Sequence, residues 1–233
     1  MDKLFLALDF KDEKKNFEIG KDALGYLIQD YSSKVGLKFN PASFIGKDAE
    51  YWSELYSLFE GTPIFIDTKF GRGPDNAERL ISKYNEFLPI DYFTVSATLG
   101  EEKLREYVKI AEKYDSKVIA FTIHTKIPEK DVKKIYNNPL DIAIYNLGEI
   151  ASNAGCDAMV LEAKMLENEE IVKLPIKKLV TGIRFDPSEK GSQARVSTFD
   201  ELVKVKDKVD YAVISKKYLE KSILKQISDL LLK

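Results

Sequence analysis

Eight short apolar runs, separated by stretches with helical periodicity, constrain the fold of this 233-residue chain more than any other feature. The runs, four of which end in Gly, Asp or Lys, cover residues 4–9, 31–36, 63–69, 92–97, 117–123, 158–161, 178–182 and 211–214. Between them, apolar residues recur with the helical period, as at Leu104, Val108 and Ala111. Strands that alternate with helices are joined as parallel neighbours. The series predicts an α/β protein with a closed (β/α)8 TIM barrel, and because no linker or repeat interrupts it, we expect one domain over residues 1–233.

Composition argues against several classes of function. The net charge is −2, from 36 basic and 38 acidic residues, so no long-range field favours nucleic acid or an acidic membrane. One cysteine rules out an internal disulfide, and one histidine argues against a zinc or triad enzyme. No apolar stretch approaches the roughly 18 residues of a membrane span, and the N-terminus lacks a signal-peptide pattern. We therefore expect a cytoplasmic protein that needs neither a metal nor a cofactor.

Polar residues follow the predicted strands, at the end of the barrel where chemistry is expected. Asp67 and Lys69 point the same way on one strand, and such a pair is costly to desolvate unless its members serve each other or a ligand. A structural ion pair at the barrel rim is the alternative. The long loop after the seventh strand, from Arg184 to Arg195, is rich in small and polar residues and is a candidate phosphate clamp.

Six ordered segments resemble the orotidine 5′-monophosphate decarboxylase superfamily, of which this chain looks like a divergent member. The segments are residues 6–9 (LALD), 33–36 (SKVG), 67–69 (DTK), 94–97 (TVSA), 154–157 (AGCD) and 180–199. The resemblance implies decarboxylation of orotidine 5′-phosphate (OMP) to UMP and CO2 by an array of Lys and Asp, without metal or cofactor. In that array the residue matching Lys69 protonates C6, Asp67 orients it, and Lys34 balances the charge. Arg72 stands where the family has a second Asp.

The resemblance also implies a set of ligand-binding residues. Positions that contact the substrate are Asp9, which matches a ribose-binding Asp, together with Ser96, Thr125, Lys126, Asp186 and Gln193. Positions that bind phosphate are Gly182, Arg184, Ser215 and Lys216. The expected ligand is thus a phosphorylated small molecule, a pyrimidine nucleotide. A homodimer is implied, with the loop that carries Arg72 crossing into the neighbouring subunit's site.

Several of these positions depart from the family pattern. Arg72 replaces an Asp, Lys126 replaces a base-contacting Ser, and Lys216 replaces an Arg. An Arg at position 72 reverses the charge that faces the substrate carboxylate, and Asp75, three positions further on, substitutes for the missing Asp only if the loop bends differently. Three hypotheses remain open: a divergent OMP decarboxylase, a repurposed enzyme with different chemistry on a phosphorylated pyrimidine nucleotide or sugar, and a nucleotide-binding pseudoenzyme. His124 is interpreted as a packed or rim side chain.

Overall fold

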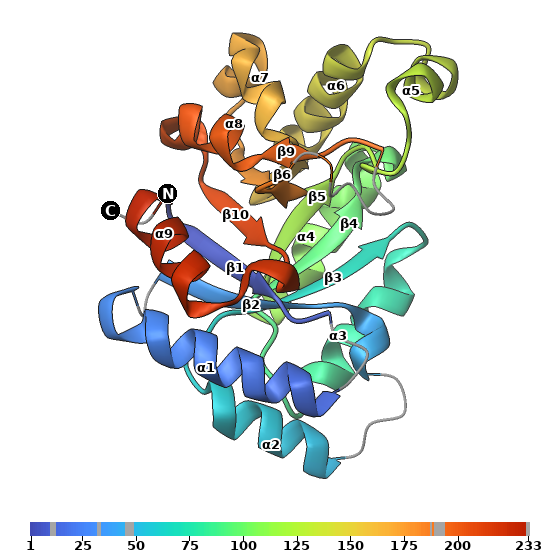
Figure 1. Cartoon of the computed structure of the whole chain (residues 1–233). Coiled ribbons are helices and arrows are strands. Elements are labelled where there is room, and N and C mark those ends of the chain that lie inside the picture. The colour runs from blue at the N-terminus through green and yellow to red at the C-terminus, as the bar shows by residue number, and fades with distance from the viewer. Residues whose placement is uncertain (10–12, 32–33, 45–48, 187, 189–193, 232–233) are drawn as a thin grey trace.

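The computed structural model describes residues 1–9, 13–31, 34–44, 49–186, 188 and 194–231. Within these residues, eight parallel strands close into a barrel in the order β1-β10-β7-β6-β5-β4-β3-β2 (Figure 1). The barrel strands are β1 (Lys3–Ala7), β2 (Val35–Phe39), β3 (Ile64–Phe70), β4 (Tyr92–Ser96), β5 (Lys117–Phe121), β6 (Ala158–Leu161), β7 (Lys177–Val180) and β10 (Tyr211–Ile214). The predicted TIM barrel is confirmed. A separate pair, β8 (Ile183–Arg184) and β9 (Ser197–Thr198), joins the two stems of the seventh loop.

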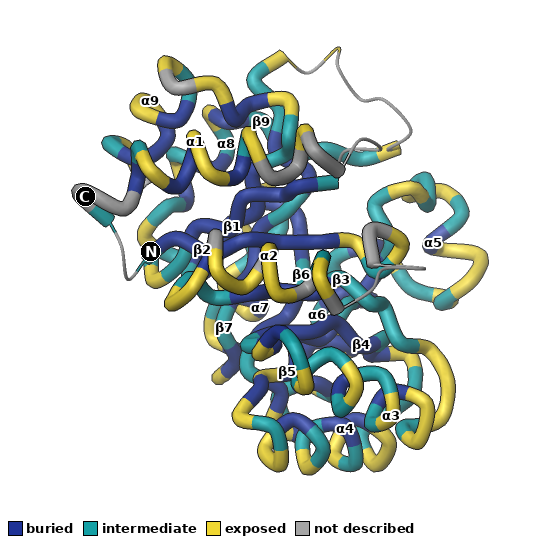
Figure 2. The backbone as a smooth tube through the Cα atoms, turned by 90° about the horizontal axis from the view of Figure 1, so that it is seen from below, coloured by how far each residue is buried: buried dark blue, intermediate teal, exposed yellow. Residues whose placement is uncertain are grey.

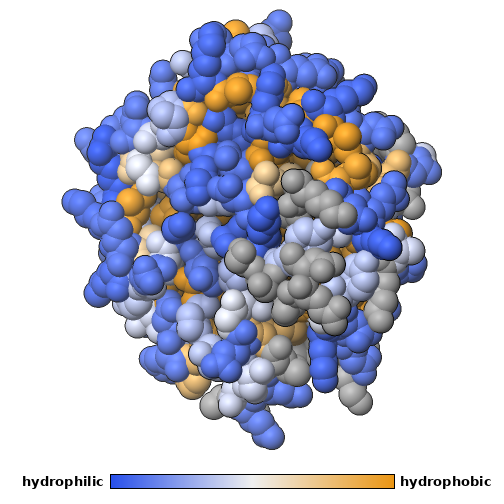
Figure 3. Space-filling view, turned by 90° about the vertical axis from the view of Figure 1, so that its left-hand side faces the viewer, coloured by the Kyte–Doolittle hydropathy of each residue, from blue (hydrophilic) through white to orange (hydrophobic). Residues whose placement is uncertain are grey.

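Helices surround the barrel, and their exposed residues lie on the outside of the molecule (Figure 2). They are α1 (Glu13–Tyr31), α2 (Ala49–Phe59), α3 (Pro74–Asn85), α4 (Glu101–Lys113), α5 (Glu129–Tyr136), α6 (Leu140–Asn153), α7 (Glu169–Lys173), α8 (Phe199–Lys204) and α9 (Lys221–Leu231). In α4, Leu104, Tyr107 and Ala111 are buried, as the helical period predicts. On the face shown in Figure 3, hydrophilic side chains predominate and apolar ones form patches between them. No helix among the described residues is long and apolar enough to span a membrane.

Aromatic side chains fill the barrel where its strands begin. Phe5 contacts Phe65, Tyr92 and Tyr211 edge to face, with ring centroids 5.1, 5.2 and 6.0 Å apart. All four rings are at most 3% exposed. Such contacts add to the apolar burial and close this end of the barrel, so that the open space lies toward the ends of the strands.

The second strand lies further along the chain than the sequence predicts. Residues 31–36 were expected to form it, but Tyr31 is the last residue of α1 and β2 begins at Val35. Gly36 pairs with Phe5 of β1, where an added Cβ would lie 2.7 Å from the Phe5 ring and 2.9 Å from the Pro63 carbonyl oxygen. Only glycine fits this contact. The strand therefore continues past Gly36 and brings Lys38, not Lys34, to its carboxyl end.

Candidate active site

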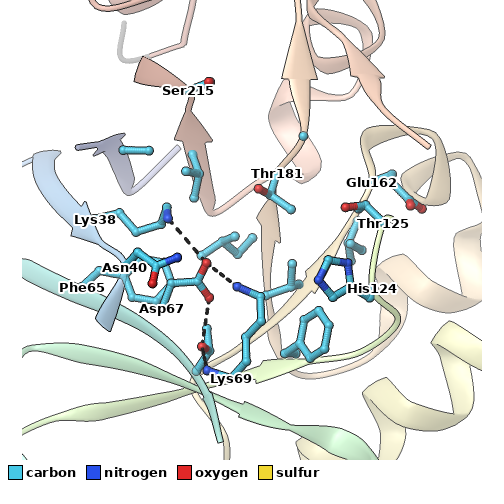
Figure 4. Close-up of a pocket in the computed structure, with 18 of the residues that line it drawn as sticks. Lys38, Asn40, Phe65, Asp67, Lys69, His124, Thr125, Glu162, Thr181 and Ser215 are labelled. Carbon is cyan, nitrogen blue, oxygen red and sulfur yellow. Dashed lines mark hydrogen bonds and ion pairs between the residues drawn. The ribbon is translucent and has the colours of Figure 1, made fainter. Parts of the chain in front are cut away.

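The candidate active site is a cavity of about 680 Å³ at the carboxyl ends of the barrel strands. This volume suits a small organic ligand. Its walls carry charged side chains on β2 and β3 and polar residues from the loops after β5, β7 and β10 (Figure 4). In the described part of the chain, no group of three or more His, Cys, Asp or Glu side chains is placed to hold a metal ion.

Four side chains of alternating charge form a continuous chain across one wall. Lys38 Nζ lies 3.0 Å from Asp9 Oδ2 and 3.4 Å from Asp67 Oδ2, and Lys69 Nζ lies 2.5 Å from Asp67 Oδ2. The side chains of Lys38 and Asp67 are 9% and 18% exposed, whereas Lys69 at 35% reaches into the open cavity. Each buried charge thus has an opposite partner, as low-dielectric surroundings require.

Neighbouring charges keep Asp67 and Lys38 ionised. Burial by itself would raise the pKa of Asp67, but the charges of Lys38 and Lys69 and hydrogen bonds from Lys69 and Thr94 outweigh it and lower the pKa to about 2. Burial would likewise lower the pKa of Lys38, and the carboxylates of Asp67 and Asp9 raise it instead. Asp67 is therefore an anion and Lys38 a cation throughout the physiological pH range.

The backbone at Lys69 is held in an unusual conformation. Its φ is 47°, in the left-handed region that side chains other than glycine rarely adopt, and the pairing of β3 with β4 is irregular between Ile66 and Phe70. The Thr94 hydroxyl accepts a hydrogen bond from the Lys69 N–H at 2.7 Å and donates one to Asp67 Oδ1 at 3.0 Å. A left-handed residue costs roughly 1–2 kcal/mol, and such strain gathers at functional sites.

Most of the predicted site residues lie together. The cavity is lined by Asp9, Asp67, Lys69, Thr125, Lys126, Gly182, Arg184 and Ser215. Lys216 lies beside it, where its Nζ donates a hydrogen bond to the Asp9 carbonyl oxygen. Gly182 has φ 75°, which turns the chain from β7 into β8 and so places Arg184 at the cavity mouth.

Other predicted residues lie elsewhere. Arg72 is exposed, does not line the cavity, and offers its carbonyl oxygen to the Tyr107 hydroxyl at 2.7 Å. Ser96 shares a hydrogen bond with Thr98 and is also outside the cavity lining. Asp186 is exposed and accepts a hydrogen bond from the Ser188 N–H. Gln193 lies outside the described residues.

The structure places Lys34 outside the cavity lining, although the resemblance implies a catalytic role for it. Lys34 immediately precedes β2 and does not line the cavity. Four residues of extended strand separate it from Lys38 by roughly 13 Å. Because side chains two and four positions apart share one face of a strand, both lysines fit the inward pattern and only the register decides between them. The register of β2 against β1 gives the position between the two carboxylates to Lys38.

Further cavity residues were missed by sequence reasoning. They are Lys38, Asn40, Thr94, Thr181 and Glu162, whereas His124, interpreted as a packed or rim side chain, also lines the cavity. Glu162 directly follows β6, so its place at a strand end was a usable signal. Its carboxylate lies 2.6 Å from Arg195 Nε, and both side chains are nearly buried.

This ion pair connects the seventh loop to the segment after β6, and further contacts of Arg195 reach the loop after β5. Arg195 also donates hydrogen bonds to the carbonyl oxygens of Ile127 and Ile123, and the Thr125 carbonyl oxygen accepts from the N–H groups of Ala194 and Arg195 at 3.0 Å each. Burial raises the pKa of Glu162, while the charge of Arg195 opposes that rise. Thr125 is therefore held in place by Ala194 and Arg195, which lie far along the chain. The contact between Arg195 and Ile127 likewise joins residues 68 positions apart.

A closed barrel with alternating Lys and Asp side chains in a cavity at its strand ends has the architecture of the TIM-barrel enzymes, whose active sites lie at that end. Residues 2–218 match the model of the "Orotidine 5'-phosphate decarboxylase / HUMPS family". The chain belongs to that family, and the predicted resemblance is confirmed.

Individual relatives agree with this assignment. An orotidine 5′-phosphate decarboxylase of Nautilia profundicola is 29% identical over 223 residues, covering 92% of this chain and 90% of the relative. One from Sulfurimonas denitrificans is 29% identical over 202 residues and covers 83% of each chain. The crystal structure of the Methanocaldococcus jannaschii decarboxylase in complex with the inhibitor BMP superposes with a TM-score of 0.72 at 20% identity over the full length of both chains. That likeness concerns the fold.

Proposed function

We propose that this protein decarboxylates OMP to UMP and CO2. The observation that carries the proposal is the chain Asp9–Lys38–Asp67–Lys69, which joins two carboxylates and two ammonium groups in one cavity wall. Family membership and relatives named orotidine 5′-phosphate decarboxylase over about nine tenths of the chain support the same reaction.

The chemistry assigned to this wall is electrostatic. Loss of CO2 from C6 of the pyrimidine leaves an electron pair on that carbon, and the Lys69 ammonium stabilises the pair and transfers a proton to it. Asp67 fixes Lys69 at 2.5 Å and, as a buried anion, opposes the substrate carboxylate before it leaves. Lys38 keeps Asp67 ionised during the reaction. The Lys69 amine then regains a proton from solvent.

The rest of the nucleotide has complementary groups nearby. Asp9 Oδ1 is buried and has no hydrogen-bond partner among the described residues, so a ribose hydroxyl would satisfy it. Arg184 and Ser215 also line the cavity and are assigned to the phosphate, with Lys216 beside it. Thr125 and Lys126, which also line the cavity, are assigned to the pyrimidine base.

Arg72 is assigned to the site of a partner subunit. It is exposed in the loop between β3 and α3, where Tyr107 holds its backbone. A homodimer that brings this loop across the interface would place a guanidinium beside the substrate carboxylate. Such a cation stabilises the bound substrate more than the transition state, in which negative charge is moving from the carboxylate to C6.

Arg72 also favours a second candidate function, a protein that binds a pyrimidine nucleotide without turning it over. The first experiment separates the two. Purified protein is incubated with OMP while loss of substrate absorbance and formation of UMP are followed, and UMP binding is measured by calorimetry. Turnover that disappears in Lys69→Ala supports the decarboxylase. Tight UMP binding without turnover supports the second function, and neither binding nor turnover contradicts both.

A further inference from the structure

His124 lines the cavity but has no place in the catalytic wall described above. It follows β5 and lies across the cavity from Lys38 and Asn40 (Figure 4). Its ring is half-buried and packs edge to face on Phe121, with centroids 5.5 Å apart and planes at 84°. The ring is thus fixed by packing and belongs to the wall opposite the one that carries β2.

One ring nitrogen of His124 is already engaged. Nδ1 accepts a hydrogen bond from the Lys126 N–H at 3.2 Å. A nitrogen that accepts a hydrogen bond carries no proton, so the neutral ring has its proton on Nε2. Lys126 is exposed, and its contribution to this wall comes through its backbone.

The surroundings favour the neutral ring. Burial, followed by the charges of Lys69 and Lys126, lowers the pKa of His124 from its ordinary value of 6.5, while Asp67 opposes the shift. Among the described residues, Nε2 has no protein hydrogen-bond partner, so its N–H remains to be satisfied by water or a ligand.

We propose that His124 is a specificity-determining residue whose Nε2–H donates a hydrogen bond to the 4-oxo group of the pyrimidine base. This rests on the proposed function, which supplies the nucleotide. A neutral donor suits a carbonyl oxygen, whereas the phosphate and carboxylate of the ligand are matched by cations on other walls. A cytosine base carries an amino group at that position, which would set two donors against each other, so the site would select a uracil-type base.

The test uses two variants and three ligands. His124→Phe keeps an aromatic ring against Phe121 without the donor, and His124→Gln keeps an amide N–H near the place of Nε2. Calorimetry with UMP, CMP and ribose 5-phosphate separates the base from the phosphate. For His124→Phe we expect UMP affinity to fall about tenfold, as for one lost hydrogen bond, with ribose 5-phosphate unchanged. His124→Gln restores part of the UMP affinity.

A spectroscopic measurement examines the tautomer directly. The chain contains a single histidine, so nitrogen NMR of protein labelled in histidine reports this ring alone. We expect a neutral imidazole with its proton on Nε2 at pH 7, and a shift of the Nε2 signal when UMP binds. A proton on Nδ1, or a UMP-to-CMP preference that His124→Phe leaves unchanged, overturns the assignment of His124 alone. A wild-type protein that binds UMP no better than ribose 5-phosphate overturns the proposed function as well.

Discussion

Replacement of Lys38 by Met would remove the cation that lies between two carboxylates while keeping most of the apolar stem. At 3.0 and 3.4 Å, each Coulomb attraction amounts to about 5 kcal/mol at an effective dielectric constant of 20, before the cost of desolvation is subtracted. Loss of one partner from a buried ion pair costs about 3–5 kcal/mol, because the remaining charge stays buried. Asp9, at 34% exposed, contributes less to this sum than Asp67 at 18%.

We therefore expect Lys38→Met to be destabilised by about 3 kcal/mol, which lowers the melting temperature of a chain of this size by roughly 6–12 °C. Its kcat/KM for OMP should fall at least about 1,000-fold, because Asp67 would lose one of the two cations that hold it in place and keep it ionised, and would position Lys69 and oppose the substrate carboxylate less well. Lys34→Met is the matched control, and we expect its kcat/KM within about threefold of wild type, since Lys34 does not line the cavity.

Thermal melts and steady-state kinetics on both variants test whether Lys38 or Lys34 lies in the site. The placement of Lys38 in the site would be refuted by a Lys38→Met protein with near-normal kcat/KM, above all if Lys34→Met were the inactive one. That outcome would mean that β2 is shifted by four residues relative to β1, which restores the sequence-based assignment to Lys34.

Three further variants examine other parts of the site. Arg72→Asp should raise kcat for OMP at least about tenfold by exchanging attraction for repulsion at the substrate carboxylate, and an unchanged or lower kcat in a folded dimer would contradict that role. Glu162→Gln should raise KM about three- to tenfold with kcat nearly retained, because Arg195 would hold the fifth and seventh loops less firmly; kinetics in which only kcat falls would contradict this. The pKa of Asp67 is lowered to about 2, so its ion pairs stabilise the fold fully above the unfolded value near 3.9 and are lost as pH falls toward 2. Denaturant unfolding should then show an advantage of wild type over Asp67→Asn that shrinks by about 2 kcal/mol between pH 5 and 2, and a difference independent of pH would count against the ion pairs.

The fold followed from the sequence because each barrel strand is an apolar run bounded by turn residues, and this pattern survives any small error in register. The positions of Asp67 and Lys69 followed for the same reason, since both stand where the third run ends. The partner of Glu162 was out of reach, because Arg195 is 33 residues away and the contact depends on how two loops fold over the barrel mouth.

The lysine in the second strand shows where such inference ends. Lys34, Gly36 and Lys38 share one face, so alternation places both lysines inside the barrel. The family-like residues around Gly36 favoured Lys34, yet the register depends on the pairing of β2 with β1 and β3, and the close approach of Gly36 to Phe5 and Pro63 involves residues distant in sequence. A single register therefore decides which ammonium group reaches Asp67.

The alternating charges of the site indicate how a cation beside Lys69 would affect binding and turnover. Asp9, Lys38, Asp67 and Lys69 alternate in sign, and the series ends at an ammonium group that faces the open cavity. A carboxylate placed next to Lys69 would continue the alternation, whereas a second cation there would draw the ligand carboxylate into the gap. Binding strength and turnover then respond in opposite directions to the charge at this one place, because the ligand carboxylate is present in the ground state and absent from the product. A protein that binds OMP tightly and converts it slowly is what this arrangement predicts.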